Sequence, residues 1–127
     1  MSKTIFLIED EPDIMYVNKT ALEGAGFKVV ALSSGKEAMA EIKKVQEKKE
    51  TNPDLILLDL VLPDINGLEI LRALREHKVT KDSKVFIFSN YTSESLLNIS
   101  YIKPDKFILK SGTTPTQLIE LVREAVK

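Results

Sequence analysis

Residues 54–67 read DLILLDLVLPDING, and this stretch decides the fold. Its apolar run, Leu55–Leu58, has no polar alternation, which is typical of a strand covered on both faces in a parallel sheet. Asp59 is the first charged residue after that run. Ligands of open α/β sheets bind outside the carboxyl ends of the strands, so we expect Asp59 at the functional site. Pro63 and Gly67 then break the pattern and predict a loop before a new helix.

Short apolar runs recur along the whole chain and alternate with segments of helical period. The five runs are Ile5–Ile8, Val29–Leu32, Leu55–Leu58, Val85–Phe88 and Phe107–Leu109. Strands that alternate with helices in this way form parallel sheets, because each right-handed crossover carries a helix over one face. The sequence therefore predicts an α/β fold with helices on both faces of a five-stranded parallel sheet.

Apolar residues at helical spacing predict helices between the runs. These positions are Ile14, Val17, Ala21 and Leu22; Ala38, Ile42 and Val45; Leu68, Leu71 and Leu74; and Leu118, Leu121, Val122 and Ala125. A weaker helix is predicted over residues 93–101, and Pro104 prevents it from continuing far.

Polar residues mark where these helices begin. Asp13 can cap the first helix, and Ser33 or Ser34 can open the second. Thr114 and Gln117 stand at the spacing of a capping box, in which each side chain accepts from the other residue's backbone N–H. We therefore expect the last helix to have the best defined start.

The totals of the chain favour one ordinary domain, residues 1–127, with room for a single core. It has 18 basic and 19 acidic residues and a net charge of −1, so we expect no direct nucleic-acid binding. The absence of cysteine fits a reduced cytoplasmic compartment. The apolar run at the N-terminus is too short for a signal peptide or a spanning helix, so we expect no membrane attachment.

The carboxyl ends of parallel strands share one edge of the sheet, so the polar and charged residues that follow the first, third, fourth and fifth runs should lie together. These residues are Glu9, Asp10 and Glu11; Asp59; Ser89 and Asn90; and Lys110 and Ser111. Carboxylates that are packed together repel one another unless a cation joins them. With oxygen ligands and room for water, Mg²⁺ fits this set better than a caged Ca²⁺ or a transition metal.

Several motifs at this edge stand in a familiar order and spacing. They are Ile8-Glu9-Asp10-Glu11-Pro12, the run Asp54–Pro63, Asn66-Gly67-Leu68, Ser89 and Leu109-Lys110. In these motifs, and over essentially its whole length, the chain resembles the receiver domain of two-component response regulators. The resemblance implies a flavodoxin-like (βα)5 sheet with strand order 2-1-3-4-5.

The resemblance also implies a phosphoacceptor and a metal site. Asp59 would accept a phosphoryl group from the phosphohistidine of a histidine kinase. Mg²⁺ would be held by Asp10, Asp59 and the backbone carbonyl of Val61, with Glu9 acting through a metal-bound water. A carboxylate can take phosphate as an acyl phosphate, for which it needs only ionisation and alignment.

Three further residues would read the phosphorylated state. Lys110 brings a point charge to one phosphoryl oxygen, and the Ser89 hydroxyl can donate to another. The resemblance implies that Ser89 then moves inward and that Phe107 follows, which reshapes the face formed by the fourth helix, fifth strand and fifth helix. Such a change is a population shift between existing packings.

The chain departs from the family pattern at three places. Ser111 stands where the family usually has a cis-proline after the lysine, so the geometry of the Lys110–Ser111 peptide bond stays open. Asn90 stands where a smaller residue is commoner, and Lys103-Pro104 replaces the usual Gly-Ala before the last strand. These departures bear on the output face and leave the acidic cluster intact.

We therefore expect a phosphorylation-controlled binding module that turns over no external substrate, either a stand-alone receiver or a domain cut from a longer chain. Its partners would be a sensor histidine kinase or phosphotransfer protein and a downstream protein target, with a phosphorylation-dependent homodimer as a further option. The main rival is a receiver-shaped scaffold that signals by binding alone. A phosphatase of the haloacid dehalogenase type is a weaker rival, because it needs an acid two residues after the nucleophile, where Val61 stands.

Overall fold

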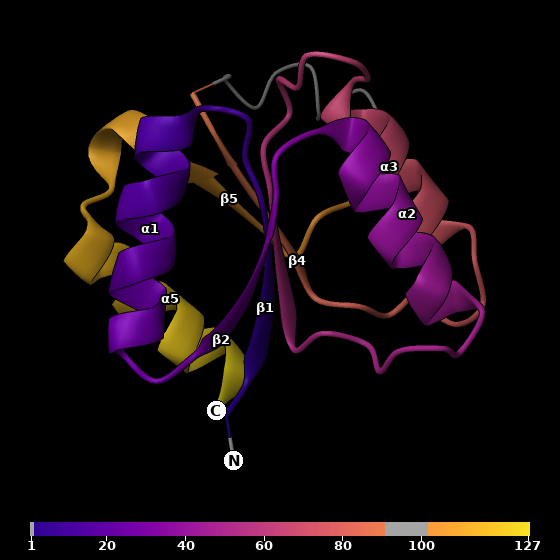
Figure 1. Cartoon of the computed structure of the whole chain (residues 1–127), viewed down its shortest axis with the longest axis horizontal. Helices are drawn as coiled ribbons and strands as arrows, with labels where there is room; N and C mark the ends of the chain where they lie inside the picture. Colours follow the sequence, from indigo (N-terminus) through magenta and orange to yellow (C-terminus); the bar gives the residue numbers. More distant parts are fainter. Residues whose placement is uncertain (1, 91–101) are drawn as a thin grey trace.

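The computed structural model describes residues 2–90 and 102–127, and its centre is a five-stranded parallel sheet (Figure 1). The strand order is β2-β1-β3-β4-β5, which confirms the predicted fold class. The strands are β1 (Thr4–Ile8), β2 (Lys28–Leu32), β3 (Leu55–Leu58), β4 (Val85–Ser89) and β5 (Lys106–Leu109). Each contains the apolar run predicted for it, extended by at most one residue at one end.

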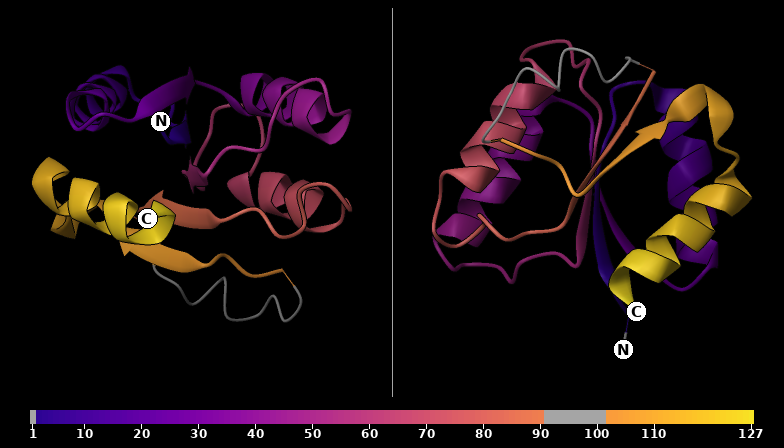
Figure 2. Two further views of the ribbon diagram at one scale, coloured as in Figure 1. Left: turned by 90° about the horizontal axis from the view of Figure 1, so that it is seen from below. Right: turned by 180° about the vertical axis from the view of Figure 1, so that it is seen from behind.

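Helices cover both faces of this sheet (Figures 1 and 2). They are α1 (Pro12–Gly24), α2 (Gly35–Gln46), α3 (Gly67–Arg75) and α5 (Pro115–Val126), with a short 3₁₀ turn at Lys110–Gly112. Helices α1 and α5 lie on one face and α2 and α3 on the other, as the crossovers predict. The helix predicted over residues 93–101 falls outside the described residues. None of the described helices has the length and apolar character that crossing a bilayer requires.

The sheet separates two hydrophobic clusters, and β3 contributes to both. Leu55 and Leu57 pack toward α1 and α5, whereas Ile56 and Leu58 pack toward α2 and α3. All four side chains are at most 1% exposed. This two-sided burial explains why the run has no polar alternation, and it makes β3 a fixed support for Asp59, the next residue.

The predicted caps of α2 and α5 are present. Ser34 is the N-cap of α2, and its hydroxyl accepts from the backbone N–H of Glu37 at 3.1 Å. Thr114 and Gln117 form the capping box of α5, with the two hydrogen bonds at 3.1 and 2.9 Å. Both helix starts therefore satisfy backbone donors that have no partner within the helix.

The prediction that Asp13 caps α1 is wrong. The N-cap position is Glu11, and Pro12 is the first helical residue, so Asp13 lies in the first turn. Proline favours this position because its fixed φ suits a helix and it has no N–H to satisfy. At the other end α1 stops at Gly24, and Gly26 then adopts a φ of +97°, which favours glycine.

Arg75, in the last turn of α3, ties that helix to the start of β5. Its guanidinium donates to the carbonyls of Lys103 at 3.0 Å and Ser83 at 2.6 Å. It also pairs with Asp105 at 3.0 Å. The Asp105 carboxylate accepts in turn from the N–H of Val85 at the start of β4. The segment that includes the unusual Lys103-Pro104 pair is thus fixed by side-chain contacts ahead of β5.

Candidate functional site

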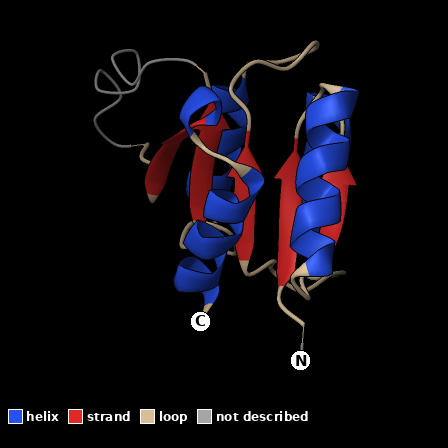
Figure 3. Ribbon diagram, turned by 90° about the vertical axis from the view of Figure 1, so that its left-hand side faces the viewer, coloured by secondary structure: helices blue, strands red, loops and turns tan. Residues whose placement is uncertain are grey.

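The carboxyl ends of the strands lie at one edge of the sheet, and both chain termini lie at the opposite edge (Figure 3). Ile8 of β1 is paired with Leu58 of β3, so the residues that follow them, Glu9 and Asp59, leave the sheet side by side. The backbone N–H of Asp59 donates to the carbonyl of Ile8 at 3.1 Å. Parallel register therefore brings together two acids that are 50 positions apart.

Lys110 joins these two acids. Its Nζ lies 2.5 Å from Oε1 of Glu9 and 2.8 Å from Oδ2 of Asp59. All three side chains are buried, with exposed fractions of 8% for the lysine, 1% for Glu9 and 6% for Asp59. The site is thus a compact, buried cluster of two acidic side chains and one lysine.

These contacts shift the pKa values of Lys110 and Glu9. Burial alone would lower the pKa of Lys110, but hydrogen bonds and charge from Asp59 and Glu9 outweigh burial, so the pKa is raised. Burial raises the pKa of the Glu9 carboxyl, and the ammonium of Lys110 opposes that rise only in part. The two acids therefore favour the charged form of Lys110, whereas burial favours the neutral form of Glu9.

Glu9, Asp10 and Asp59 together form a candidate metal site. One carboxylate oxygen from each lies within 4.8 Å of the others. Glu9 and Asp59 are buried, while Asp10 is half-buried at the rim. The donors are all oxygen, which suits a hard divalent cation such as Mg²⁺.

The loop after Asp59 bends back tightly and keeps Val61 close to that carboxylate. The backbone N–H of Val61 donates to Oδ1 of Asp59 at 3.1 Å. Val61 is bridged to Asn66, and the N–H of Gly67 donates to the carbonyl of Leu60 at 2.9 Å. A side chain at position 67 would overlap the backbone carbonyl of Asp59, so only glycine fits there.

The structure describes both predicted switch residues, Ser89 and Phe107, but only part of the predicted output face. Ser89 is 1% exposed at the end of β4 and is paired in register with Leu109, next to Lys110. Phe107 is half-buried on β5 and packs against the cluster on the α2 and α3 face. The fourth helix of the predicted output face lies outside the described residues.

Two of the departures from the family pattern contact each other. The side-chain oxygen of Asn90 accepts from the backbone N–H of Ser111 at 2.8 Å, which links the end of β4 to the 3₁₀ turn. Peptide bonds within the described residues are trans, including Lys110–Ser111.

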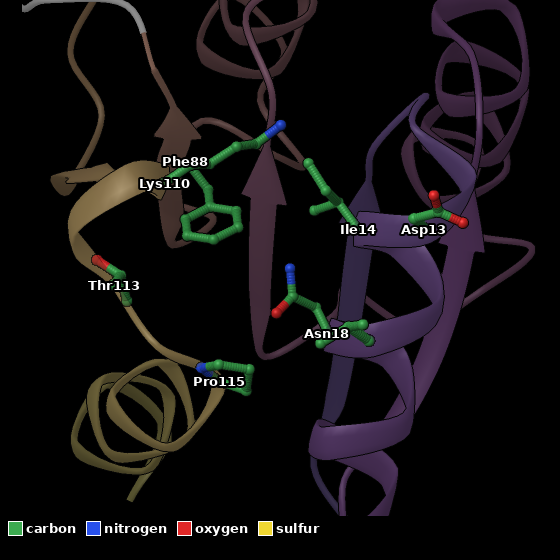
Figure 4. A pocket seen from close by; sticks show the side chains of 8 residues that line it. Asp13, Ile14, Asn18, Phe88, Lys110, Thr113 and Pro115 are labelled. Atoms are coloured by element: carbon green, nitrogen blue, oxygen red, sulfur yellow. The ribbon is translucent and has the colours of Figure 1, made fainter.

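A pocket of about 280 Å³ adjoins the lysine between α1 and the segment that leads into α5 (Figure 4). Asn18 projects from α1 into it and is only 6% exposed. Apolar spacing along α1 did not single out this buried amide, because polar residues of helices usually face solvent. The pocket is lined by Asp13, Ile14, Val17, Asn18, Phe88, Lys110, Thr113 and Pro115.

Asp64 is the other residue whose contacts the sequence did not predict. The sequence indicates only a polar loop residue at this position. In the structure, its carboxylate accepts from the backbone N–H groups of Gly35 and Lys36, both at 2.8 Å. The hydrogen bond from Lys36 lowers the pKa of Asp64 most, and further backbone donors add to this effect. A contact between positions 35 and 64 leaves no local signal in either stretch.

Comparison with known proteins places this geometry in a family. Residues 5–123 match the model of the response regulator receiver domain. The alkaline phosphatase synthesis transcriptional regulatory protein PhoP of Bacillus subtilis is 38% identical over 79 residues, which cover 62% of this chain and 30% of PhoP. The chain thus spans less than a third of the length of that relative.

Two solved structures resemble the chain over nearly its whole length. The phosphorylated cyanobacterial phytochrome response regulator RcpA is 32% identical with a TM-score of 0.79, and the match covers 98% of this chain and 91% of RcpA. The Mn²⁺-bound form of response regulator Rcp1 is 25% identical with a TM-score of 0.78, and the match covers 96% and 90%. Sheet order, acidic edge and family match agree, and the chain belongs to the receiver domain family of response regulators in two-component systems.

Proposed function

We propose that this receiver domain is a signalling switch in which Asp59 accepts a phosphoryl group from the phosphohistidine of a sensor histidine kinase or phosphotransfer protein. The observation that carries the proposal is the position of the Asp59 carboxylate. It lies at the end of a strand buried on both faces, beside the acids Glu9 and Asp10 and in contact with the ammonium of Lys110. A scaffold that signals by binding alone has no need of this arrangement.

The transfer needs alignment and charge stabilisation more than covalent assistance. A carboxylate oxygen of Asp59 attacks phosphorus, an O–P bond forms as the N–P bond of the phosphohistidine breaks, and the electron pair returns to the imidazole nitrogen. Negative charge spreads over the equatorial oxygens in the transition state. Lys110 is already 2.8 Å from the attacking carboxylate and can donate to one of these oxygens.

The acidic edge fits Mg²⁺ as the cofactor. Asp10, Asp59 and the carbonyl of Val61 would hold the ion, and Glu9 would contact it indirectly. When bound, Mg²⁺ neutralises charge on the phosphoryl oxygens. The structure of Rcp1 was determined with Mn²⁺ and that of RcpA in the phosphorylated state, which supports the same chemistry here.

Phosphorylation would be read through Lys110, Ser89 and Phe107. Lys110 would exchange its contact with Asp59 for one with a phosphoryl oxygen, and Ser89 would donate to another. Phe107 is half-buried on β5, the strand next to β4, so a change at Ser89 would reach the surface beside β5 and α5 through this ring. We infer a protein target at that face, or a second copy of the chain, in the cytoplasm. The net charge of −1 favours a protein over direct nucleic-acid binding.

Labelling with acetyl phosphate tests the proposal. The chain is incubated with acetyl phosphate and Mg²⁺, and intact mass spectrometry counts the phosphoryl groups. We expect one group on the wild type and none on Asp59→Asn. The matched control is Asp54→Asn, an exposed acid at the other end of β3, which should label normally. No labelling of the wild type would favour the scaffold, and equal labelling of Asp59→Asn would overturn the assignment of Asp59 as the phosphoacceptor.

A further inference from the structure

We propose that Asp64 is a positioning residue for the Mg²⁺ site: it ties the loop of residues 60–66 to the N-terminus of α2 and so orients the Val61 carbonyl. This inference rests on the proposed function, because it concerns how that site is held. Asp64 itself lies outside the acidic cluster formed by Glu9, Asp10 and Asp59.

Asp64 accepts two of the three hydrogen bonds that cap the first turn of α2. Gly35 and Lys36, the first two helical residues, donate their N–H groups to Oδ1 and Oδ2 of Asp64, both at 2.8 Å. The next N–H, from Glu37, goes to the hydroxyl of Ser34. A carboxylate at a helix N-terminus is also stabilised by the helix dipole. The bidentate contact therefore joins two segments that are 28 to 29 residues apart.

Close packing supports the same junction. A Cβ at Gly35 would overlap the side chain of Ile65 and would lie 2.9 Å from Oδ1 of Asp64. The missing side chain thus lets the loop lie directly on the first turn of α2. The N–H of Ile65 also donates to Oδ1 of Asp64 at 3.1 Å, which fixes the carboxylate relative to its own backbone.

The loop is therefore held at two places. Near Asp59, Gly67 packs against the strand end and donates to Leu60. At its far side, Asp64 holds it to α2. Val61 lies between these points. A ligand carbonyl held at both sides binds an ion with less loss of conformational freedom than one on a mobile loop. Loss of the Asp64 contact should weaken Mg²⁺ binding although Asp64 makes no contact with the ion.

A control at Ser34 separates this role from simple helix capping. Ser34→Ala removes the other side-chain cap of the same helix but leaves the loop contacts of Asp64 in place. If Asp64 acted only through the stability of α2, Asp64→Ala and Ser34→Ala would change the Mg²⁺ affinity equally. Asp64→Asn adds a second test, because it keeps the shape of the side chain but replaces one acceptor oxygen with a donor.

The experiment measures Mg²⁺ affinity by titration calorimetry and, separately, the Mg²⁺ concentration that half-saturates labelling by acetyl phosphate. For Asp64→Ala we expect both values to rise by about threefold or more, with a smaller rise for Asp64→Asn. Ser34→Ala should change both Mg²⁺ values by less than about twofold. It should nevertheless lower the melting temperature about as much as Asp64→Ala does. If Asp64→Ala does not fold, the Mg²⁺ affinity of Asp64→Asn, compared with that of Ser34→Ala, tests the positioning role.

The results distinguish the two proposals. Unchanged Mg²⁺ affinity in both Asp64 variants, or an equal change in Ser34→Ala, would overturn the positioning role while Asp59 remained the phosphoacceptor. A wild type that neither binds Mg²⁺ nor becomes labelled would overturn both.

Discussion

Lys110 Nζ lies 2.8 Å from Oδ2 of Asp59, although the two residues are 51 positions apart in the chain. The contact spans β4, which separates β3 from β5 in the sheet. It also leaves both groups buried. A buried ion pair depends on both members, because removing one leaves the other charged and desolvated.

Replacing the lysine should therefore destabilise the protein when Mg²⁺ is absent. For Lys110→Met we expect the free energy of unfolding to fall by about 3 kcal/mol in magnesium-free buffer. Added Mg²⁺ should restore part of this loss. Urea denaturation measures both values. The control is Lys106→Met, an exposed lysine at the start of β5, and an equal loss in that variant would contradict the role of the ion pair.

Removing one acid from the cluster should have the opposite effect. Asp10→Asn relieves repulsion with Glu9 and Asp59, so without Mg²⁺ the variant should be more stable by an amount of the order of 1 kcal/mol. It should also lose the rise in melting temperature that Mg²⁺ gives the wild type. Thermal unfolding without Mg²⁺ measures the gain in stability, and unfolding with Mg²⁺ measures the lost rise in melting temperature. A variant that is less stable and still responds to Mg²⁺ would count against the cluster.

The phosphorylated form should be long-lived. Val61, two residues after Asp59, is 49% exposed and offers no polar group to orient an attacking water. For Val61→Asn we expect hydrolysis of the acyl phosphate to be at least about tenfold faster. Val61→Ala is the control and should leave the lifetime unchanged. Loss of the label is followed by mass spectrometry, and a wild-type lifetime of seconds would refute this expectation.

The contacts of Arg75 should contribute to stability away from the site. Arg75→Met leaves the carbonyls of Lys103 and Ser83 without their donor and breaks the pair with Asp105. We expect a loss of about 2 kcal/mol in the free energy of unfolding. Arg72→Met, on an exposed position of the same helix, should change it by less than about 0.5 kcal/mol. Similar losses in the two variants would show that the contacts have no net effect.

Asp64 should make the protein sensitive to acid. Its folded pKa is lowered, chiefly by the hydrogen bond from Lys36, so its carboxylate stabilises the folded state above the ordinary pKa of about 3.9. This contribution is lost as the pH falls through the lowered folded pKa. The wild type should therefore be more stable than Asp64→Asn at about pH 6 and similar to it at about pH 2. Denaturant unfolding at both pH values tests this, and a constant difference would argue against it.

The elements with a repeating pattern could be predicted from the sequence. The unbroken run at Leu55–Leu58 matches β3 at both ends, because burial on both faces leaves no place for a polar residue. The meeting of Glu9, Asp59 and Lys110 followed from the shared edge of parallel strands. The pairing of Lys110 with Glu9 and Asp59 at once could not be predicted, since it depends on side-chain geometry.

Contacts between loops and helix ends gave no such pattern. Asp64 reaches α2 only because Gly35 has no side chain and the loop folds back over it. The start of α1 was placed wrongly at Asp13, because Pro12 can begin a helix without a side-chain cap. In both cases the deciding interaction is one that local spacing does not record.

The burial of β3 on both faces has a mechanical consequence. A strand whose side chains are at most 1% exposed cannot shift without disturbing both layers of helices. If Asp59 is phosphorylated as proposed, we expect the resulting movement in a less tightly packed part of the molecule than β3. Strand β5 lies at the edge of the sheet, and its residues Lys106 and Leu109 are exposed. It can therefore shift more easily than the central strand β3.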